Sequence, residues 1–177
     1  MPALNINPDM LPGIQTSQAT PWDLQISTLR DRLAAIGLPA LKAEGTTLHI
    51  HQHLDVFIHG KSAGIPAGIG INEFQFFISP IHTHDTTGVM HIESPVLQVF
   101  TLGQFFDIWG VRFTKNCVGG FCQEGDVPLR VYLNGKEYTD DPRNLALQAH
   151  QEIVIAYGTD QELPSPIPEM YTFPEGL

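Results

Sequence analysis

From position 47 onward, apolar and polar residues alternate along the chain, a pattern typical of strands that are buried on one face. The clearest case is the segment TLHIHQHLDVFI at 47–58. Its apolar positions are Leu48, Ile50, Leu54, Val56 and Ile58. Its polar positions include His49, His51, His53 and Asp55. We therefore expect a long strand that carries three imidazoles on one side.

Two dipeptides predict tight hairpin turns. Asn134-Gly135 lies within LRVYLNGKEY, and Asn-Gly is the strongest short signal for a two-residue hairpin turn. The upstream segment LDVFIHGKSA aligns with this segment at a constant offset of 75 and shares its Leu, Val, Gly and Lys, so we expect His59-Gly60 to form a similar turn. Further strand-like patterns occur at 65–71, 74–79, 89–93, 96–100, 111–114 and 152–157.

Two segments have helical patterns. In 21–37, apolar residues recur at spacings of three and four, Thr20 is a suitable cap, Pro21 suits the first helical position and Gly37 is a stop signal. The segment 102–109 follows a threonine with capping-box spacing to a glutamine and ends before a glycine. We expect the first helix to supply only core residues.

These elements predict a mainly β protein: a compact antiparallel sandwich or barrel with an N-terminal helix and one short inserted helix. Residues 1–20 lack periodicity and are expected to form an extended arm. Residues 21–177 then form a single domain. Its end, 163–177, contains four prolines, which exclude a central strand and predict an extended strap.

Composition and charge exclude some classes of partner. The 177 residues are 42% hydrophobic and 16% charged, which is ordinary globular composition. Nine basic against nineteen acidic residues give a net charge of −10, which argues against nucleic acid and anionic membrane surfaces. No apolar run is long enough for a membrane span, so direct membrane insertion is not expected. A metal cation remains a suitable partner, and a homo-oligomer is left open.

The two cysteines, Cys117 and Cys122, flank a Gly-Gly pair in CVGGFC. The glycines let the chain fold back sharply, so a small disulfide loop is expected over two free thiols. A disulfide favours an oxidising compartment. In contrast, the first twenty residues have neither a basic nor an apolar leader region, so we expect no signal peptide in this chain. The localisation therefore stays open.

The histidines are the main candidate chemistry, since seven of the eight lie between positions 49 and 91. In SPIHTHDTTGVMHIESP, a turn centred on Thr86-Thr87 would place His82 opposite His91, with His84 on the same face. Three imidazoles converging in this way can bind one transition metal and leave a coordination position open. A shift of one residue in register would move His91 to the other face.

The upstream strand offers further ligands. His51 and His53 are the next candidates after the hairpin histidines, followed by His49. The strand that carries these three could add ligands to the same ion or form a second site. Glu93 shares a face with His91 and is a candidate ligand or general base. Asp85, His59 and His150 are expected to be structural. Imidazoles with optional carboxylates favour Zn or Cu, with Fe or Ni as alternatives, while the lack of Cys and Met ligands disfavours Cu(I) and iron–sulfur sites.

Four segments together resemble an uncharacterised family of bacterial proteins: EGTTLHIHQHLDVFIHGK, IPAGIGI, SPIHTHDTTGVMHIESP and FTLGQFFDIWGVRF. The resemblance covers about residues 21–177. It implies a module that is often secreted or attached to membrane segments, which slightly favours an extracytoplasmic location. It also implies that the histidine strand and the histidine hairpin act as one unit.

Three functions remain open at this stage. The first is a protein that binds a transition metal through its histidine cluster without turnover, and this is the reading we prefer because six histidines exceed the needs of one catalytic site. The second is a metalloenzyme with a three-His site for hydration, hydrolysis or oxygen chemistry. The third is a β interaction domain without metal, whose histidines respond to pH.

Overall fold

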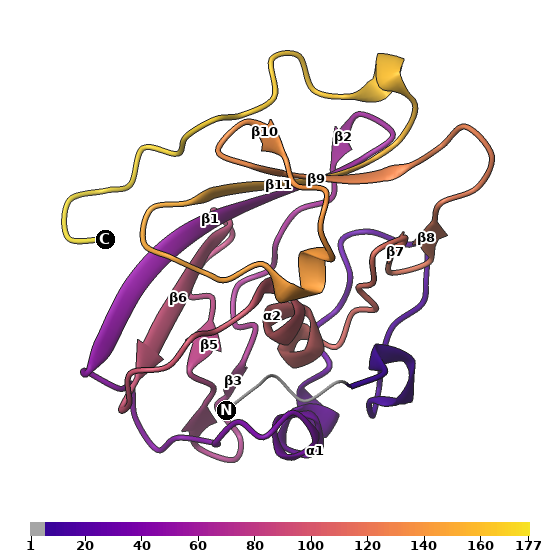
Figure 1. The fold of residues 1–177 in the computed structure, drawn as a ribbon. Coiled ribbons are helices and arrows are strands. Elements are labelled where there is room, and N and C mark those ends of the chain that lie inside the picture. Colours follow the sequence, from indigo (N-terminus) through magenta and orange to yellow (C-terminus); the bar gives the residue numbers. More distant parts are fainter. Residues whose placement is uncertain (1–5) are drawn as a thin grey trace.

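A mixed sheet of seven strands forms the centre of the protein in the computed structural model, which describes residues 6–177 (Figure 1). The strand order is β10-β9-β11-β1-β6-β5, and β2 pairs with the end of β1. The strands are β1 (Leu48–Ile58), β2 (Lys61–Ser62), β5 (Ile81–His82), β6 (Val89–Ser94), β9 (Leu129–Leu133), β10 (Lys136–Glu137) and β11 (Glu152–Tyr157). Two small hairpins lie outside this sheet: β3 (Ile71–Asn72) with β4 (Phe77–Ile78), and β7 (Cys117–Val118) with β8 (Phe121–Cys122).

The predicted fold class, mainly β with an N-terminal helix and one short helix, is confirmed. The expected antiparallel sandwich or barrel is met only in part, because the sheet does not close and its central pair, β1 and β11, is parallel. All other strand pairs of this sheet are antiparallel. The sequence of β11, EIVIAY, agrees with its place in a parallel pair. The strand is buried throughout, as expected for a central parallel strand that is covered on both faces.

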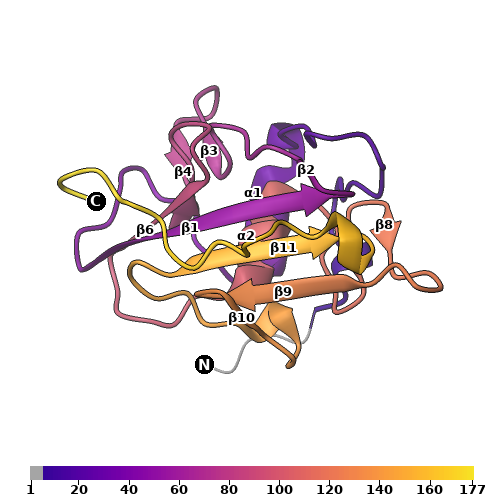
Figure 2. The same cartoon turned by 90° about the horizontal axis from the view of Figure 1, so that it is seen from above.

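The two faces of the sheet are covered differently (Figures 1 and 2). The helices pack under one face, where Leu54, Val56 and Ile58 of β1 join the main core. The C-terminal segment crosses the other face above β11 and β9, and its residues Leu163 and Ile167 pack there on a small second cluster. This second face also carries the histidines of β1, and Tyr171 of the C-terminal segment covers His53 there.

Both predicted two-residue turns are confirmed. His59-Gly60 joins β1 to β2, and Asn134-Gly135 joins β9 to β10. All four residues have positive φ, as a type I′ turn requires. In contrast, the expected strands at 96–100 and 111–114 are wrong, since the second forms only isolated bridges. Of 65–71 only Ile71 is strand, and of 74–79 only Phe77–Ile78. The Gly-rich segment 67–70 forms turns instead, because Gly68 and Gly70 both adopt positive φ.

The inserted helix α2 (Leu102–Trp109) lies where the sequence predicts it. Thr101 and Gln104 form the expected capping box, and Gly110 ends the helix in the left-handed conformation. Its Asp107 is buried and accepts two hydrogen bonds from Arg143, which lies within the short 3-10 turn η3 (Pro142–Asn144).

The N-terminal helix is shorter than the predicted 21–37. A 3-10 turn, η2 (Ile26–Thr28), leads into α1 (Leu29–Ala35), so Pro21 is not the first helical residue. Residues before η2 are held by tertiary contacts instead: Trp22 is buried and its indole N–H donates to the Ser17 carbonyl, and the amide N–H of Asp23 donates to the Gln15 side chain. Burial of the indole thus outweighs local helix signals.

The helix segment supplies the predicted core residues, and it also places a charged side chain in the core, since the guanidinium of Arg32 is buried. It donates to the carbonyls of Pro12, Gln25 and Ile108 and to the Thr28 hydroxyl. These bonds tie α1 to the N-terminal segment and to the end of α2. Burial lowers the pKa of Arg32 to about 10, which still leaves it charged at neutral pH.

Both terminal segments lie against the domain where the structure describes them. In the expected arm 1–20, residues 1–5 fall outside the described residues; the rest contains η1 (Pro8–Met10), and Gln15 pairs with Val111. The expected strap 163–177 follows η4 (Asp160–Glu162) and contains no strand. No helix within residues 6–177 has the length and apolar character that a membrane span needs.

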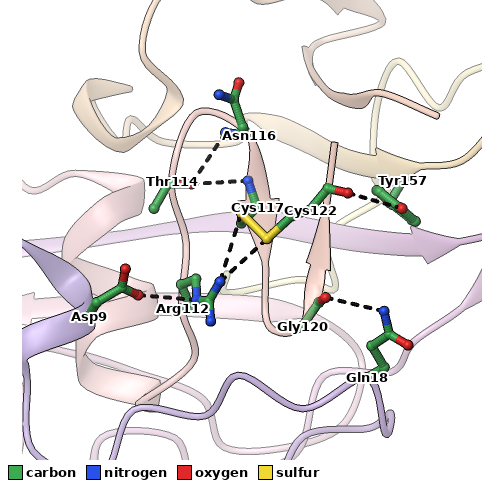
Figure 3. The surroundings of a disulfide bond; sticks show 9 residues. All are labelled: Asp9, Gln18, Arg112, Thr114, Asn116, Cys117, Gly120, Cys122 and Tyr157. Atoms are coloured by element: carbon green, nitrogen blue, oxygen red, sulfur yellow. Dashed lines mark hydrogen bonds and ion pairs between the residues drawn. A yellow bond between two sulfur atoms is a disulfide. The ribbon is translucent and has the colours of Figure 1, made fainter. Parts of the chain in front are cut away.

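Cys117 and Cys122 form a disulfide across the β7–β8 hairpin (Figure 3). Arg112 points at both sulfur atoms and forms an ion pair with Asp9, so the disulfide loop, the strand-like segment before it and the N-terminal segment meet here. The Tyr157 hydroxyl donates to the Cys122 carbonyl and links the loop to β11.

Candidate metal centre

Three neighbouring strands bring the predicted ligands together on one face of the sheet. The register places His51 of β1 opposite His91 of β6, and His91 opposite His82 of β5, so that these three form one row across the strands. In the next row, His49 lies opposite Glu93. The hairpin therefore has the register predicted from the sequence, and the histidine strand lies directly beside it.

His82 is fully buried, and a backbone carbonyl determines its tautomer. Its Nδ1 lies 3.0 Å from the carbonyl oxygen of Ser79. Because a carbonyl oxygen only accepts hydrogen bonds, Nδ1 carries the proton and Nε2 of the neutral ring keeps its lone pair. Nε2 lies 3.1 Å from Nε2 of His84 and 3.9 Å from Oε2 of Glu93. The lone pair thus faces the cluster, with the backbone support that metal-binding histidines usually have.

His84 and His91 complete the hairpin side of the cluster. Their ring centroids lie 4.6 Å apart, and those of His82 and His91 lie 5.6 Å apart. Nδ1 of buried His91 lies 3.6 Å from Oε1 of Glu93, which is too long for a hydrogen bond. His84 is more exposed, and its Nε2 lies 3.3 Å from Oε1 of Glu44. Each of these imidazoles therefore lies next to a carboxylate.

His49 and His51 approach the same carboxylate from β1. The Nε2 atoms of the two rings are 3.2 Å apart, and Nε2 of His49 lies 3.2 Å from Oε1 of Glu93. The ring of His51 also lies 4.6 Å from that of His91, measured between centroids. Glu93 consequently lies between the histidines of the hairpin and those of β1.

Burial and mutual repulsion keep the buried imidazoles neutral. Burial, together with the neighbouring His84, His51 and His49, lowers the pKa of His82 to about 4. For His91, burial and then the neighbouring imidazoles, first His51, lower the pKa to about 4. The pKa of His51 is lowered by burial and by His49. A neutral imidazole is the form that binds a metal ion, so at neutral pH these rings need not lose a proton first.

The carboxylates near the cluster repel each other. Burial raises the pKa of Glu93 above its usual range, and the nearby Glu44 raises it further. A cation placed between these groups would relieve both the burial cost and the repulsion, which is the usual role of a metal ion among buried carboxylates.

The donor atoms form two groups that share Glu93. One contains His82, His84, His91 and Glu93, the other His49, His51 and Glu93, and within each group one donor atom per residue lies within 4.8 Å of the others. On a tetrahedral ion with bonds of about 2.0–2.1 Å, adjacent donors lie about 3.3 Å apart. The 3.1 Å and 3.2 Å separations between histidine nitrogens are close to that value. These groups can therefore hold a metal ion.

His53 does not join the cluster, although the sequence places it on the same face as His51. Its Nδ1 lies 2.8 Å from Oε2 of Glu152 and its Nε2 lies 2.8 Å from the Thr87 carbonyl oxygen. Both partners are acceptors, so both ring nitrogens are protonated. Burial alone would lower the pKa of His53, but the bonds to Glu152 and Thr87 raise it above the usual value. Tyr171 of the C-terminal segment stacks on this ring at 3.9 Å between centroids.

With Asp55 and Glu152, His53 forms a third group of potential metal donors. We interpret it instead as a buried ion pair, because its imidazole has no free lone pair while both hydrogen bonds are present. The structure thus places the donor atoms of His53 in another group than those of the hairpin histidines, and its predicted role as a ligand of their ion stays a prediction. The groups are separate because β11, which supplies Glu152, lies on the other side of β1 from β6.

The residues expected to be structural have structural contacts. The carboxylate of Asp85 accepts from the backbone N–H of Thr87 and so caps its own loop. His59 is the first turn residue after β1, and its ring contacts Glu162. His150 stacks on Phe173 and contacts the Leu177 carbonyl.

Two carboxylates near the histidines were not predicted. Glu44 reaches His84 because the chain at Gly45 passes so close to β6 that a Cβ there would lie 2.1 Å from the Ser94 carbonyl carbon. The local signal was an acidic residue followed by glycine, just before the histidine strand. Glu152 reaches His53 only through the pairing of β1 with β11, and no local signal in the sequence indicates that pairing.

A comparison of the chain with models of known protein families, with curated proteins and with solved structures finds no match. The assignment of a function therefore depends on the chemistry of the site itself.

Proposed function

We propose that this protein binds a divalent transition metal ion, Zn(II) or Cu(II), through His82, His84, His91 and Glu93. The observation that supports this most is the orientation of His82: a fully buried imidazole donates from Nδ1 to a carbonyl and directs its Nε2 lone pair at His84 and Glu93. Imidazole nitrogens with a carboxylate oxygen suit Zn(II) and Cu(II), and they also accept Fe(II) and Ni(II).

The surroundings of the cluster favour this function over a pH-sensitive surface without metal. Three of the cluster histidines, His51, His82 and His91, are buried and have lowered pKa values. With pKa values of about 4, His82 and His91 stay neutral at mildly acidic pH. A pH-sensing surface needs histidines that do titrate there. Strongly lowered pKa values in a group of converging side chains are typical of functional sites.

The test is the metal content of the protein purified without an affinity tag. We expect bound Zn(II) or Cu(II) in the wild type, a strong loss in His84→Ala and in His91→Ala, and no loss in His150→Ala, whose ring lies at the C-terminal segment. Equal metal content in all of these proteins would mean that the site is wrongly placed. A wild type that binds neither ion would refute the proposal.

A metalloenzyme is the second candidate, and a pocket beside the cluster favours it. The pocket has a volume of about 360 Å³ and is lined by Leu24, Ile26, Ala67, Ile71, Phe74 and His84, among others. Such mostly apolar pockets of a few hundred Å³ are common ligand sites. A metal ion held by His84 would lie beside this pocket, where a small molecule with an apolar body could reach an exchangeable coordination position.

Azide titration of the cobalt-substituted protein separates the two candidates. An enzyme needs an exchangeable position, so its visible spectrum should change as azide replaces water on cobalt. A binding protein with a filled coordination sphere should show no change. If the spectrum changes, Phe74→Ala, which alters the exposed edge of the pocket without touching the cluster, should change the affinity for apolar-bodied anions more than that for azide.

A further inference from the structure

We infer that the cluster holds two metal ions, with Glu93 as a bridging ligand: one ion bound by His82, His84 and His91, and a second by His49 and His51. This inference rests on the proposed function, because the second ion shares Glu93 with the first. It assigns a role to two imidazoles for which a single-ion site has no use.

The number of donors is the first argument. A four-coordinate ion is already supplied by the three hairpin histidines and Glu93. His49 and His51 are then surplus, yet their Nε2 atoms lie 3.2 Å apart, close to the spacing of two ligands on one ion. They form a separate donor group, whose only member in common with the first group is Glu93.

The position of Glu93 is the second argument. Its Oε1 lies 3.2 Å from Nε2 of His49 and 3.6 Å from Nδ1 of His91, and its Oε2 lies 3.9 Å from Nε2 of His82. The carboxylate thus lies within reach of both histidine groups, as a ligand that bridges two ions must. Ions bridged in this way in two-metal sites lie about 3.5–4 Å apart.

The strand register explains why this arrangement is rigid. His49 and Glu93 are directly opposite each other on β1 and β6, and so are His51 and His91. Paired residues on adjacent strands have Cβ atoms about 5 Å apart, so the backbone of the sheet positions every donor of the two groups except His84. Only His84 and Glu44 lie outside the strands.

A bridging role would change the function expected for Glu93. As a ligand to two ions it could not act as a free general base, so in an enzyme with this site a bound water or hydroxide would be the base or nucleophile. Glu44, which is half-exposed and lies beside His84, would be the remaining carboxylate at the edge of the site.

The test measures how many Zn(II) ions bind per chain, by calorimetric titration and by elemental analysis after the excess is removed. We expect two ions in the wild type, one in His49→Ala and two in His59→Ala. The two variants are matched, since the His49 and His59 side chains are 53% and 47% exposed and both substitutions should leave the fold intact. Circular dichroism of each variant checks this.

The outcomes separate the two proposals. One ion in the wild type that His49→Ala keeps and His84→Ala loses would overturn the second site and leave the proposed function standing. One ion that both variants lose would mean a single ion shared by all donors, which also overturns the inference. If the wild type binds no ion, the proposed function fails and the inference with it.

A second measurement distinguishes a bridged pair from two distant sites. In protein loaded with two Cu(II) ions, ions about 3.5–4 Å apart interact magnetically and broaden or weaken the electron paramagnetic resonance signal. A second ion at His53 and Glu152 would instead add an independent spectrum. Two undisturbed Cu(II) spectra would therefore overturn the bridging role of Glu93.

Discussion

Replacing His53 with glutamine should destabilise the protein strongly without removing its metal. The same replacement of His82 should weaken metal binding strongly and change the stability little. Both histidines are buried in the same sheet, but His53 forms an ion pair with Glu152 at 2.8 Å, with side-chain exposures of 6% and 1%. Removing one partner of a buried ion pair typically costs about 3–5 kcal/mol, because the other charge stays buried without a counter-charge. His82 takes part only in neutral hydrogen bonds, each worth about 1 kcal/mol.

The predicted loss converts into a change that thermal unfolding can resolve. For a chain of this size, about 1 kcal/mol shifts the melting temperature by roughly 2–4 °C. His53→Gln should therefore melt about 6–20 °C below the wild type when both are free of metal. It should still bind Zn(II) with wild-type stoichiometry, since neither nitrogen of His53 faces the cluster.

The assay compares calorimetric melting of the metal-free proteins with Zn(II) titrations of the same samples. His82→Gln should melt within a few degrees of the wild type and bind Zn(II) much more weakly. If His53→Gln loses Zn(II) binding while its melting temperature barely changes, His53 is a ligand and our reading of the His53–Glu152 pair is wrong.

Three further predictions concern other parts of the molecule. Zn(II) at a hundredfold excess over its dissociation constant should stabilise the wild type by about 2.7 kcal/mol and raise its melting temperature by roughly 5–11 °C. A chelator should reverse this rise. A melting temperature that Zn(II) does not raise would contradict binding to the folded state. Burial raises the pKa of Tyr132 above 10, so the hydroxyl loses its proton at lower pH in the unfolded chain than in the folded protein. The free energy of unfolding should therefore fall as the pH rises above 10. In urea unfolding at alkaline pH, Tyr132→Phe should show a smaller fall than the wild type. Replacing both Cys117 and Cys122 with serine opens a six-residue loop and should cost about 2 kcal/mol in urea unfolding, and an unchanged midpoint would show that the loop is held by its other contacts.

Local rules explain which parts of the fold could be predicted. The capping box of α2 and the turns at His59-Gly60 and Asn134-Gly135 depend on backbone sterics within a few residues, and all three lie where the sequence predicts them. The N-terminal helix begins later than predicted because burial of Trp22 is a tertiary contact. The buried guanidinium of Arg32 could not be predicted either, since its acceptors come from the N-terminal segment and from the end of α2.

The same division holds for the candidate site. The sequence by itself determined that His49, His51 and His53 share one face of a strand, because side chains alternate with a period of two, and that His82 lies opposite His91, because the turn sets the register. Only the tertiary structure decided which neighbours these imidazoles meet. On β6, His49 and His51 lie opposite Glu93 and His91, but His53 lies opposite Val89 and takes its partner, Glu152, from β11 on the other side. The order of the strands depends on the burial of the whole sheet, which no local pattern contains. For this reason His53, the third histidine of the alternating pattern, pairs with Glu152 beside the cluster and does not join it.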